Sequence, residues 1–115
     1  MSDSSPKTPE NPPANPVASL PQLEPVAAMF ALGSVFRWPI IKMLADGREM
    51  NITEGANVAG CTAVNFSKHL GVMLAAGVVE CRQGADRRQT IFYIPAARRQ
   101  VPGVIDYGFC KIQLK

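Results

Sequence analysis

The sequence predicts one α+β domain in which a helix-turn-helix is followed by a β-hairpin. Helical patterns at 53–59 and 62–76 are separated by a tight turn, which is the arrangement of a helix-turn-helix. Two β-prone runs, 78–83 and 89–94, then flank a charged turn. The chain has 115 residues, of which 47% are hydrophobic and 18% charged, so it has room for about one domain. A two-domain enzyme is therefore not expected.

Residues 1–24 are predicted to form a disordered, proline-rich tail. Seven of the ten prolines lie in the first 25 residues, mixed with Ser, Asn and Ala. Such a segment has little apolar area to bury and favours extended polyproline geometry. The tail has a single basic residue, Lys7, beside its PxxP motifs, and a linker is favoured over a ligand for an SH3-type domain.

Two short helices are expected next, beginning near Pro25. The first is mostly apolar and ends at Gly33. The second carries an apolar stripe at helical spacing, formed by Phe36, Ile40, Met43 and Leu44. Ser34 is its expected N-cap and Gly47 its stop. Pro39 removes a backbone donor, so the second helix either starts close to this proline or bends there.

The helix-turn-helix follows a short strand or loop at 48–52. Its first helix spans 53–59 and its second 62–76, with Gly77 as the C-cap. A helical wheel divides the second helix into two sides. The apolar side must face the core and holds Phe66, Leu70, Met73 and Leu74. The opposite side is small, polar and singly basic, and holds Val64, Asn65, Ser67, Lys68 and Gly71.

The polar side of this second helix fits the major groove of DNA. Asn65 can donate to and accept from an adenine edge, and Ser67 and Lys68 can reach bases or phosphates. Gly71 lets the helix backbone approach the DNA backbone closely. No bulky group on this side would hold the helix away from a surface. We therefore expect this helix to contact base edges.

The tip of the predicted hairpin supplies a second contact. Its charged turn, 84–88, contains Arg87 and Arg88, and Arg82 lies near the base of the first strand. Guanidinium groups at these positions can bind phosphates or enter the minor groove. The alternative is that the two turn arginines are merely solvated. The neighbouring helix-turn-helix favours the functional interpretation.

The charge of the folded part suits a polyanionic partner such as nucleic acid. The formal net charge is +3, but residues 1–24 carry one cation and three anions. The rest of the chain therefore holds a net charge of +5. Net charge does not identify a partner by itself, because many basic domains bind no nucleic acid.

Three segments resemble the winged helix-turn-helix repressors of the ArsR type. Residues 67–79, SKHLGVMLAAGVV, look like the family's recognition-helix signature S-R-H-L-x-x-L-x-x-A-G-L-V. Residues 36–47 are similar to its second-helix pattern around T-R-x-x-I-L-x-x-L, and residues 89–94 to its wing strand. The resemblance covers about Val26 to Pro95. It implies about four helices plus a β-hairpin wing. The alternating pattern of the last residues adds an extra C-terminal strand to this fold.

The resemblance also implies which residues contact DNA. By position they are Thr62, Ala63, Asn65, Ser67, Lys68 and His69. Ser67 and His69 match the family's phosphate or base contacts. Ala63 stands where relatives often carry Gln or another long polar side chain, so direct contact with a base is lost there. His69 lies beside the apolar stripe on the wheel, and its alternative role is a partly buried histidine bonded to the backbone.

The C-terminus departs from the family, whose members commonly end with a dimerising helix. Residues 96–115 are predicted to be an extension that ends in a strand, 109–114. One face of this strand holds Cys110, Ile112 and Leu114. The strand packs on the domain, where it can extend the wing sheet, or crosses to a second subunit. An apolar first helix cannot bury itself alone, so we expect it to form a homodimer contact through Met29, Phe30 and Leu32.

No metal, cofactor or membrane association is predicted. Thiophilic sites need two or three converging thiolates and zinc needs about four ligands. The chain has one histidine and three widely spaced cysteines, Cys61, Cys81 and Cys110. The longest apolar stretch, 26–36, is interrupted and too short to cross a bilayer. The N-terminus lacks the basic and then apolar order of a signal peptide, so a cytoplasmic location is expected by default.

The leading interpretation is a homodimeric, sequence-specific transcriptional regulator that binds double-stranded DNA and acts as a repressor. Helix 62–77 would lie in the major groove and wing 84–88 on the minor groove or backbone, with half-sites about one helical turn apart. The alternative is a winged-helix protein-interaction module without DNA binding. An enzyme is not expected, because the chain lacks a spaced carboxylate pair, a phosphate-binding glycine loop and a nucleophile motif.

Overall fold

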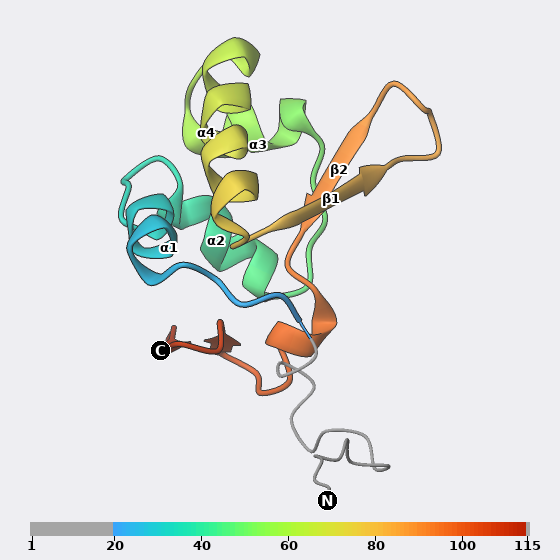
Figure 1. Ribbon diagram of the computed structural model, residues 1–115. Coiled ribbons are helices and arrows are strands. Elements are labelled where there is room, and N and C mark those ends of the chain that lie inside the picture. The colour runs from blue at the N-terminus through green and yellow to red at the C-terminus, as the bar shows by residue number, and fades with distance from the viewer. Residues whose placement is uncertain (1–19, 115) are drawn as a thin grey trace, which may run out of the picture.

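The computed structural model describes residues 20–114, which form four α-helices followed by two β-hairpins (Figure 1). The elements are α1 (Pro25–Leu32), α2 (Trp38–Ala45), α3 (Ile52–Ala59), α4 (Ala63–Ala76), β1 (Glu80–Gln83), β2 (Thr90–Tyr93), β3 (Val104–Asp106) and β4 (Lys111–Gln113). A short 3₁₀ helix, Ala96–Arg98, joins the two hairpins. This is the element order of the winged helix that the sequence predicts, with an extra C-terminal hairpin. Most of the predicted tail, residues 1–19, lies outside the described residues.

Local sequence signals set the ends of α3 and α4. Asn51 and Glu54 form a capping box, in which each side chain accepts from the other's backbone amide, at 2.8 and 2.9 Å. Thr62 Oγ1 accepts a backbone amide of the first turn of α4 at 3.1 Å. Gly60 and Gly77 end the two helices with φ of 72° and 79°, a left-handed conformation that favours glycine. The predicted glycine stop after α4 is confirmed, and α3 begins one residue earlier than predicted.

The start of α2 differs from the predicted apolar stripe. Ser34 Oγ accepts the Phe36 amide at 3.1 Å, so it caps a turn that precedes the helix. The helix then begins at Trp38 and places Pro39 in its first turn. Amides of the first turn make no hydrogen bond within a helix, so the N–H that proline lacks is not needed there. The helix therefore starts close to the proline, which is one of the two predicted alternatives. Phe36 lies outside the helix and is 47% exposed, so its predicted place on the stripe is wrong.

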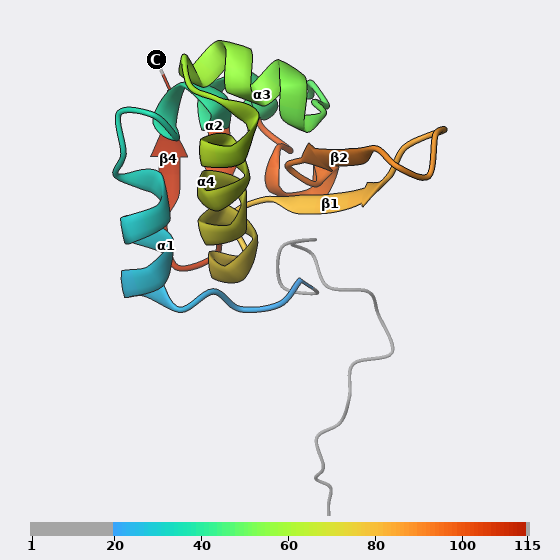
Figure 2. The same ribbon diagram turned by 90° about the horizontal axis from the view of Figure 1, so that it is seen from above.

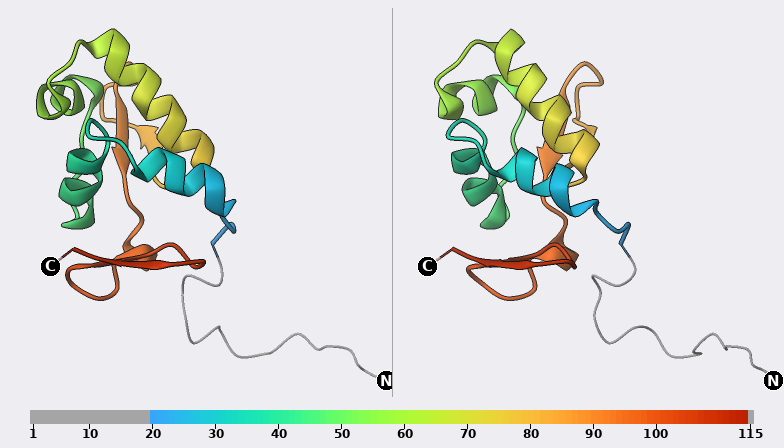
Figure 3. Two further views of the ribbon diagram at one scale, coloured as in Figure 1. Left: turned by 90° about the vertical axis from the view of Figure 1, so that its left-hand side faces the viewer. Right: turned by 60° about the vertical axis from the view of Figure 1, so that its left-hand side comes forward.

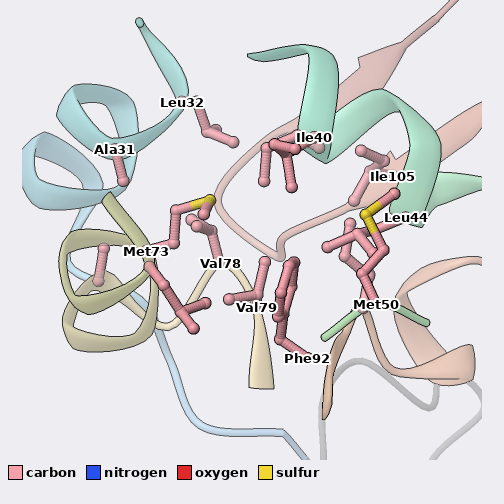
Figure 4. Close-up of a cluster of buried hydrophobic side chains, with 14 of the residues drawn as sticks. Ala31, Leu32, Ile40, Leu44, Met50, Met73, Val78, Val79, Phe92 and Ile105 are labelled. Carbon is pink, nitrogen blue, oxygen red and sulfur yellow. The ribbon is translucent and has the colours of Figure 1, made fainter. Parts of the chain in front are cut away.

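The hydrophobic core lies between the helices and the base of the first hairpin (Figure 4). α4 points Phe66, Leu70 and Met73 into this core, as the wheel predicts. Val78 and Val79 are buried beside them but precede β1, because the Val78 amide still bonds the Met73 carbonyl at 3.1 Å. The other helices and β2 contribute Ala28, Ala31, Leu32, Ile40, Ile41, Leu44 and Phe92.

β1 and β2 form the wing, an antiparallel hairpin that extends away from the helices beside α4 (Figure 2). At its base, Met50 and Phe92 exchange two backbone hydrogen bonds of 2.8 and 3.1 Å. Phe92 is fully buried, and its ring centroid lies 5.5 Å from that of Phe66 on α4. The wing is therefore joined at its base both to the segment before α3 and to the core side of α4.

The C-terminal residues form a second hairpin of their own. The strand β4 pairs with β3, and Ile112 stands opposite Ile105. β4 therefore does not extend the wing sheet, although such an extension is one of the predicted arrangements. The predicted alternation is confirmed. Cys110, Ile112 and Leu114 are partly buried, and the residues that alternate with them are exposed, namely Phe109, Lys111 and Gln113. Figure 3 shows this hairpin at the end of the molecule opposite the N-terminus of α4.

Two buried polar side chains attach the C-terminal hairpin to the domain. Tyr107 is 1% exposed, and its hydroxyl donates to the Val78 carbonyl at 2.9 Å. Burial raises the pKa of Tyr107, so the hydroxyl keeps the proton that it donates. Arg98 is also buried and donates to the carbonyls of Asp106 and Pro21 at 3.3 and 3.2 Å. Pro21, which belongs to the predicted tail, therefore contacts the folded domain.

Removing the Tyr107 hydroxyl is expected to lower the free energy of unfolding. Tyr107→Phe leaves the Val78 carbonyl without this partner in a buried position, at a cost of about 1–3 kcal/mol. Urea unfolding followed by circular dichroism measures the change. Tyr93→Phe is the control, because Tyr93 is only partly buried and its hydroxyl bonds no described residue. Equal losses in the two variants would contradict the assigned role of the Tyr107–Val78 bond.

Candidate nucleic-acid interface

The N-terminal half of α4 presents a row of exposed side chains. The predicted DNA contacts Thr62, Ala63, Asn65, Ser67 and Lys68 are all exposed. Val64 is 70% exposed on the same half of the helix, although the sequence analysis assigned it no role. A Cβ added at Gly71 would meet no atom within 4 Å. This face of α4 is therefore not covered by any other part of the described chain.

The tip of the wing carries two exposed arginines on an ordered turn. The Asp86 carboxylate accepts the Arg88 amide at 3.0 Å, and the Asp86 carbonyl accepts the Gln89 amide at 2.9 Å. Arg87 and Arg88 are both exposed, and neither forms an ion pair with another described residue. Their guanidinium groups are available to phosphate oxygens.

Arg82, the third predicted arginine, is engaged within the domain. It forms an ion pair with Glu49, and its guanidinium carbon lies 5.8 Å from the centroid of the Tyr93 ring. Glu49 lies just before the bridge between Met50 and β2, so this pair links the same two segments as the bridge. The ion pair partly neutralises the charge of Arg82, so its guanidinium is less available to an anionic partner than those of the wing tip.

The N-terminal end of α4, which carries this row, and the tip of the wing lie at the same end of the molecule. In Figure 1 the N-terminal end of α4 and the wing tip both rise above the domain, and the turned views of Figure 3 agree. The C-terminal hairpin and the start of α1 lie at the other end. One flat or convex partner could therefore contact both projections together.

His69 lies one turn along α4 from Asn65 and is bonded to a buried arginine. Its Nδ1 is 3.0 Å from Arg37 Nη1, and its ring centroid is 5.5 Å from that of Phe36. The alternative in which His69 bonds the backbone is wrong, since its partner is the Arg37 side chain. Partial burial, and secondly the positive charge of Arg37, lower the pKa of His69 from its ordinary value of 6.5.

α1 has one buried and one exposed apolar face. Met29 and Phe30 of the predicted dimer contact are 55% and 67% exposed. Leu32, the third residue of that prediction, is only 8% exposed and belongs to the core, so its placement in an interface is wrong. Val26 on α1 and Val35 in the following turn, which sequence reasoning missed, are 68% and 82% exposed. We call Val26, Met29, Phe30 and Val35 the α1 patch.

Other features of the described residues offer little to bind a metal. No group of three or more His, Cys, Asp or Glu residues lies close enough to hold an ion within residues 20–114. All three cysteines are free thiols, and burial raises the pKa of Cys110.

An open pocket of about 370 Å³ lies beside α2 and α3, lined by Met43, Arg48, Glu49, Met50, Glu54, Asn57 and Val58. No helix in this part of the chain is long and apolar enough to span a bilayer.

Solved structures of winged-helix proteins share this fold. HlyU from Vibrio cholerae N16961 has a TM-score of 0.56 at 20% sequence identity, covering 66% of this chain and 79% of that chain. Reduced HlyU from the same organism has a TM-score of 0.53 at 21% identity, covering 61% and 70%. NadR in complex with 4-hydroxyphenylacetate has a TM-score of 0.50 at 19% identity, covering 83% and 72%. No family model and no curated protein matches the sequence.

Proposed function

We propose that this chain is a sequence-specific transcriptional regulator that binds double-stranded DNA as a homodimer and acts as a repressor of the ArsR type. One observation carries the proposal: the exposed half of α4 and the arginine tip of the wing lie at the same end of the molecule. A helix and a basic loop placed in this way fit adjacent grooves of one duplex. The winged-helix fold of HlyU and NadR supports the proposal.

Selection of bound sites from a random pool of duplex DNA tests this function. In the proposed complex α4 lies in the major groove, where Asn65 bonds an adenine edge and Ser67 and Lys68 contact bases or phosphates. Arg87 and Arg88 contact the minor groove or the backbone beside it. We expect enrichment of a palindrome whose half-sites are about one helical turn apart. A pool without any enriched sequence would overturn the proposal.

The α1 patch supports the homodimer. α1 contains no polar residue, and its buried face already packs in the core through Ala28, Ala31 and Leu32. The residues Val26, Met29 and Phe30 follow helical spacing on the remaining face, which a second copy of α1 would cover. Two-fold symmetry places one α4 in each half-site of a palindrome. Occupation of an operator by such a dimer in place of polymerase gives repression.

Removing one cation from either projection is expected to weaken DNA binding at all sequences. Lys68→Ala and Arg87→Ala each remove a phosphate contact, so each reduces the slope of log K against log salt by about one unit per subunit. Fluorescence anisotropy with a labelled duplex between low and moderate salt measures the slope. Lys111→Ala is the matched control, because Lys111 is an exposed cation on β4 at the opposite end of the molecule. The proposal fails if the slope is unchanged in both α4 and wing variants, or falls equally in the control.

A second candidate is a winged-helix protein-interaction module. It is favoured by the internal use of several cations: Arg37 and Arg98 are buried, and Arg82 is paired with Glu49. The exposed positive charge of the domain is therefore smaller than the sequence indicates. Retention on immobilised random duplex DNA separates the two functions. Salt-dependent retention supports the regulator, whereas elution in the void volume at low salt supports the interaction module.

A further inference from the structure

Arg37 connects three parts of the domain through one buried guanidinium. The residue is 8% exposed and lies in the turn before α2. Its Nε donates to the Ala31 carbonyl at 2.6 Å and its Nη2 to the Phe30 carbonyl at 2.9 Å, both at the C-terminal end of α1. Its Nη1 lies 3.0 Å from His69 Nδ1 on α4. The carbonyl bonds fix the guanidinium, so its third contact has a defined direction.

This contact determines which nitrogen of His69 carries the proton. A guanidinium has only donors and stays protonated in proteins, so the nitrogen that it faces must accept. His69 Nδ1 is that acceptor, and the single proton of the neutral ring is therefore on Nε2. Protonating Nδ1 as well would place two donors and two positive charges face to face.

No acidic group nearby counteracts this effect. α1 packs against α4 and contains no titratable side chain. The turn before α2 supplies Arg37, and the neighbouring residue on α4 itself is Lys68, a second cation. The Phe36 ring covers His69 with an apolar surface. α3 also packs against α4 and carries the carboxylate of Glu54, but this carboxylate accepts the Asn51 amide in the capping box and does not shift the pKa of His69. The groups that face the imidazole therefore favour the neutral ring.

We propose that Arg37 is a positioning residue that holds His69 as a neutral donor, with its Nε2–H available to a phosphate or base acceptor of bound DNA. The proposal rests on the proposed function of α4 as the recognition helix. The resemblance to the ArsR type implies a DNA contact at His69 but does not specify its charge. Arg37 makes this contact a hydrogen bond from an uncharged group, in contrast to the cationic contact of Lys68.

Nitrogen NMR of the full chain tests the tautomer directly. The sequence contains one histidine, so imidazole signals of ¹⁵N-labelled protein belong to His69 alone. At pH 7.5 we expect the shift of an unprotonated Nδ1 and a protonated Nε2, and titration to more acidic pH than a free histidine. A protonated Nδ1, an even mixture of tautomers, or an unchanged titration would overturn the proposal.

Variants of Arg37 separate positioning from mere stabilisation. Arg37→Met keeps the length of the side chain and removes the donors, so the tautomer preference should be lost and the pKa of His69 should return towards its ordinary value. Arg37→Lys keeps the charge but cannot supply the three bonds of the planar fork, so it should also lose the preference. If either variant keeps the wild-type nitrogen shifts, Arg37 does not position the ring. If both fail to fold, the wild-type spectrum still decides the tautomer.

DNA binding tests the charge of the contact on a selected site. His69→Ala should reduce affinity about 2- to 10-fold, the size of one uncharged hydrogen bond, without changing the salt slope. His69→Gln, which retains an N–H donor, should recover part of the loss. A reduced slope in His69→Ala, or unchanged affinity there while Lys68→Ala weakens binding, would overturn the inference and leave the proposed function intact. If the wild-type protein shows no sequence-specific binding to DNA, the proposed function itself is overturned.

Discussion

Gly55→Ala is expected to destabilise the domain, although alanine is a better helix former than glycine. Gly55 lies in α3 against two core rings. An added Cβ would stand 2.5 Å from Phe66 Cε2 and 2.8 Å from Phe92 Cζ, closer than real Cβ contacts. Both rings are fully buried and pack on each other, so neither can move without disturbing α4 or the wing. We expect the free energy of unfolding to fall by about 1–3 kcal/mol, measured as a lower urea midpoint at unchanged m value.

Gly71→Ala is the matched control within α4. A Cβ at Gly71 meets no atom within 4 Å, so the change should stabilise the helix by about 0.5–1 kcal/mol through the lower backbone entropy of alanine. The two glycine substitutions are thus expected to have opposite signs. If Gly55→Ala is as stable as Gly71→Ala, then α3 does not approach the aromatic pair as closely as described.

Met29→Glu is expected to reduce affinity for a two-half-site operator by about 100-fold or more, because two linked subunits bind far more tightly than either alone. Met29 lies on the α1 patch, where a second copy of α1 would bury its side chain. A carboxylate there would lose its hydration in the interface and face its own symmetry copy. Sedimentation should show a monomer, and anisotropy should show weak binding equal to that of an isolated half-site.

Val101→Glu is the control for charge. Val101 is 58% exposed in the loop before β3, and the substitution adds the same negative charge to an exposed apolar position outside the α1 patch. Any general electrostatic weakening of DNA binding appears in both variants, and only Met29→Glu should dissociate the dimer. A dimer that persists in Met29→Glu would place the subunit contact elsewhere.

The helix-turn-helix could be predicted because its signals are local. Gly77 adopts a left-handed backbone, and the apolar positions of α4 repeat at helical spacing. The caps Asn51, Glu54 and Thr62 are equally local, although no prediction used Asn51 or Thr62 as caps. β3 could not be predicted in this way, since three residues give too short a run to show alternation. α1 is apolar on every side, so periodicity could not show that Leu32 faces the core while Met29 faces outward.

The exposure of the candidate interface residues could be predicted for α4 from the helical wheel and for the wing tip from its turn sequence. Apart from His69, which is partly buried, the predicted residues of α4 and the wing tip lie on the surface. The Arg37–His69 bond was not predictable, because it joins side chains 32 residues apart. The ion pair between Arg82 and Glu49 joins residues 33 positions apart and could not be predicted for the same reason. Such pairs depend on how the elements pack, which a single sequence does not specify.

The backbone bridge between Met50 and Phe92 restrains the wing relative to α4. Because this bridge and the Phe66–Phe92 pair anchor the wing at its base, the angle between the wing and α4 is set by contacts inside one chain. Changing that angle would require breaking two backbone bonds and repacking buried rings. In the proposed dimer, a signal that changes DNA binding would therefore need less energy to change the spacing between the two subunits, which moves each subunit as a rigid body.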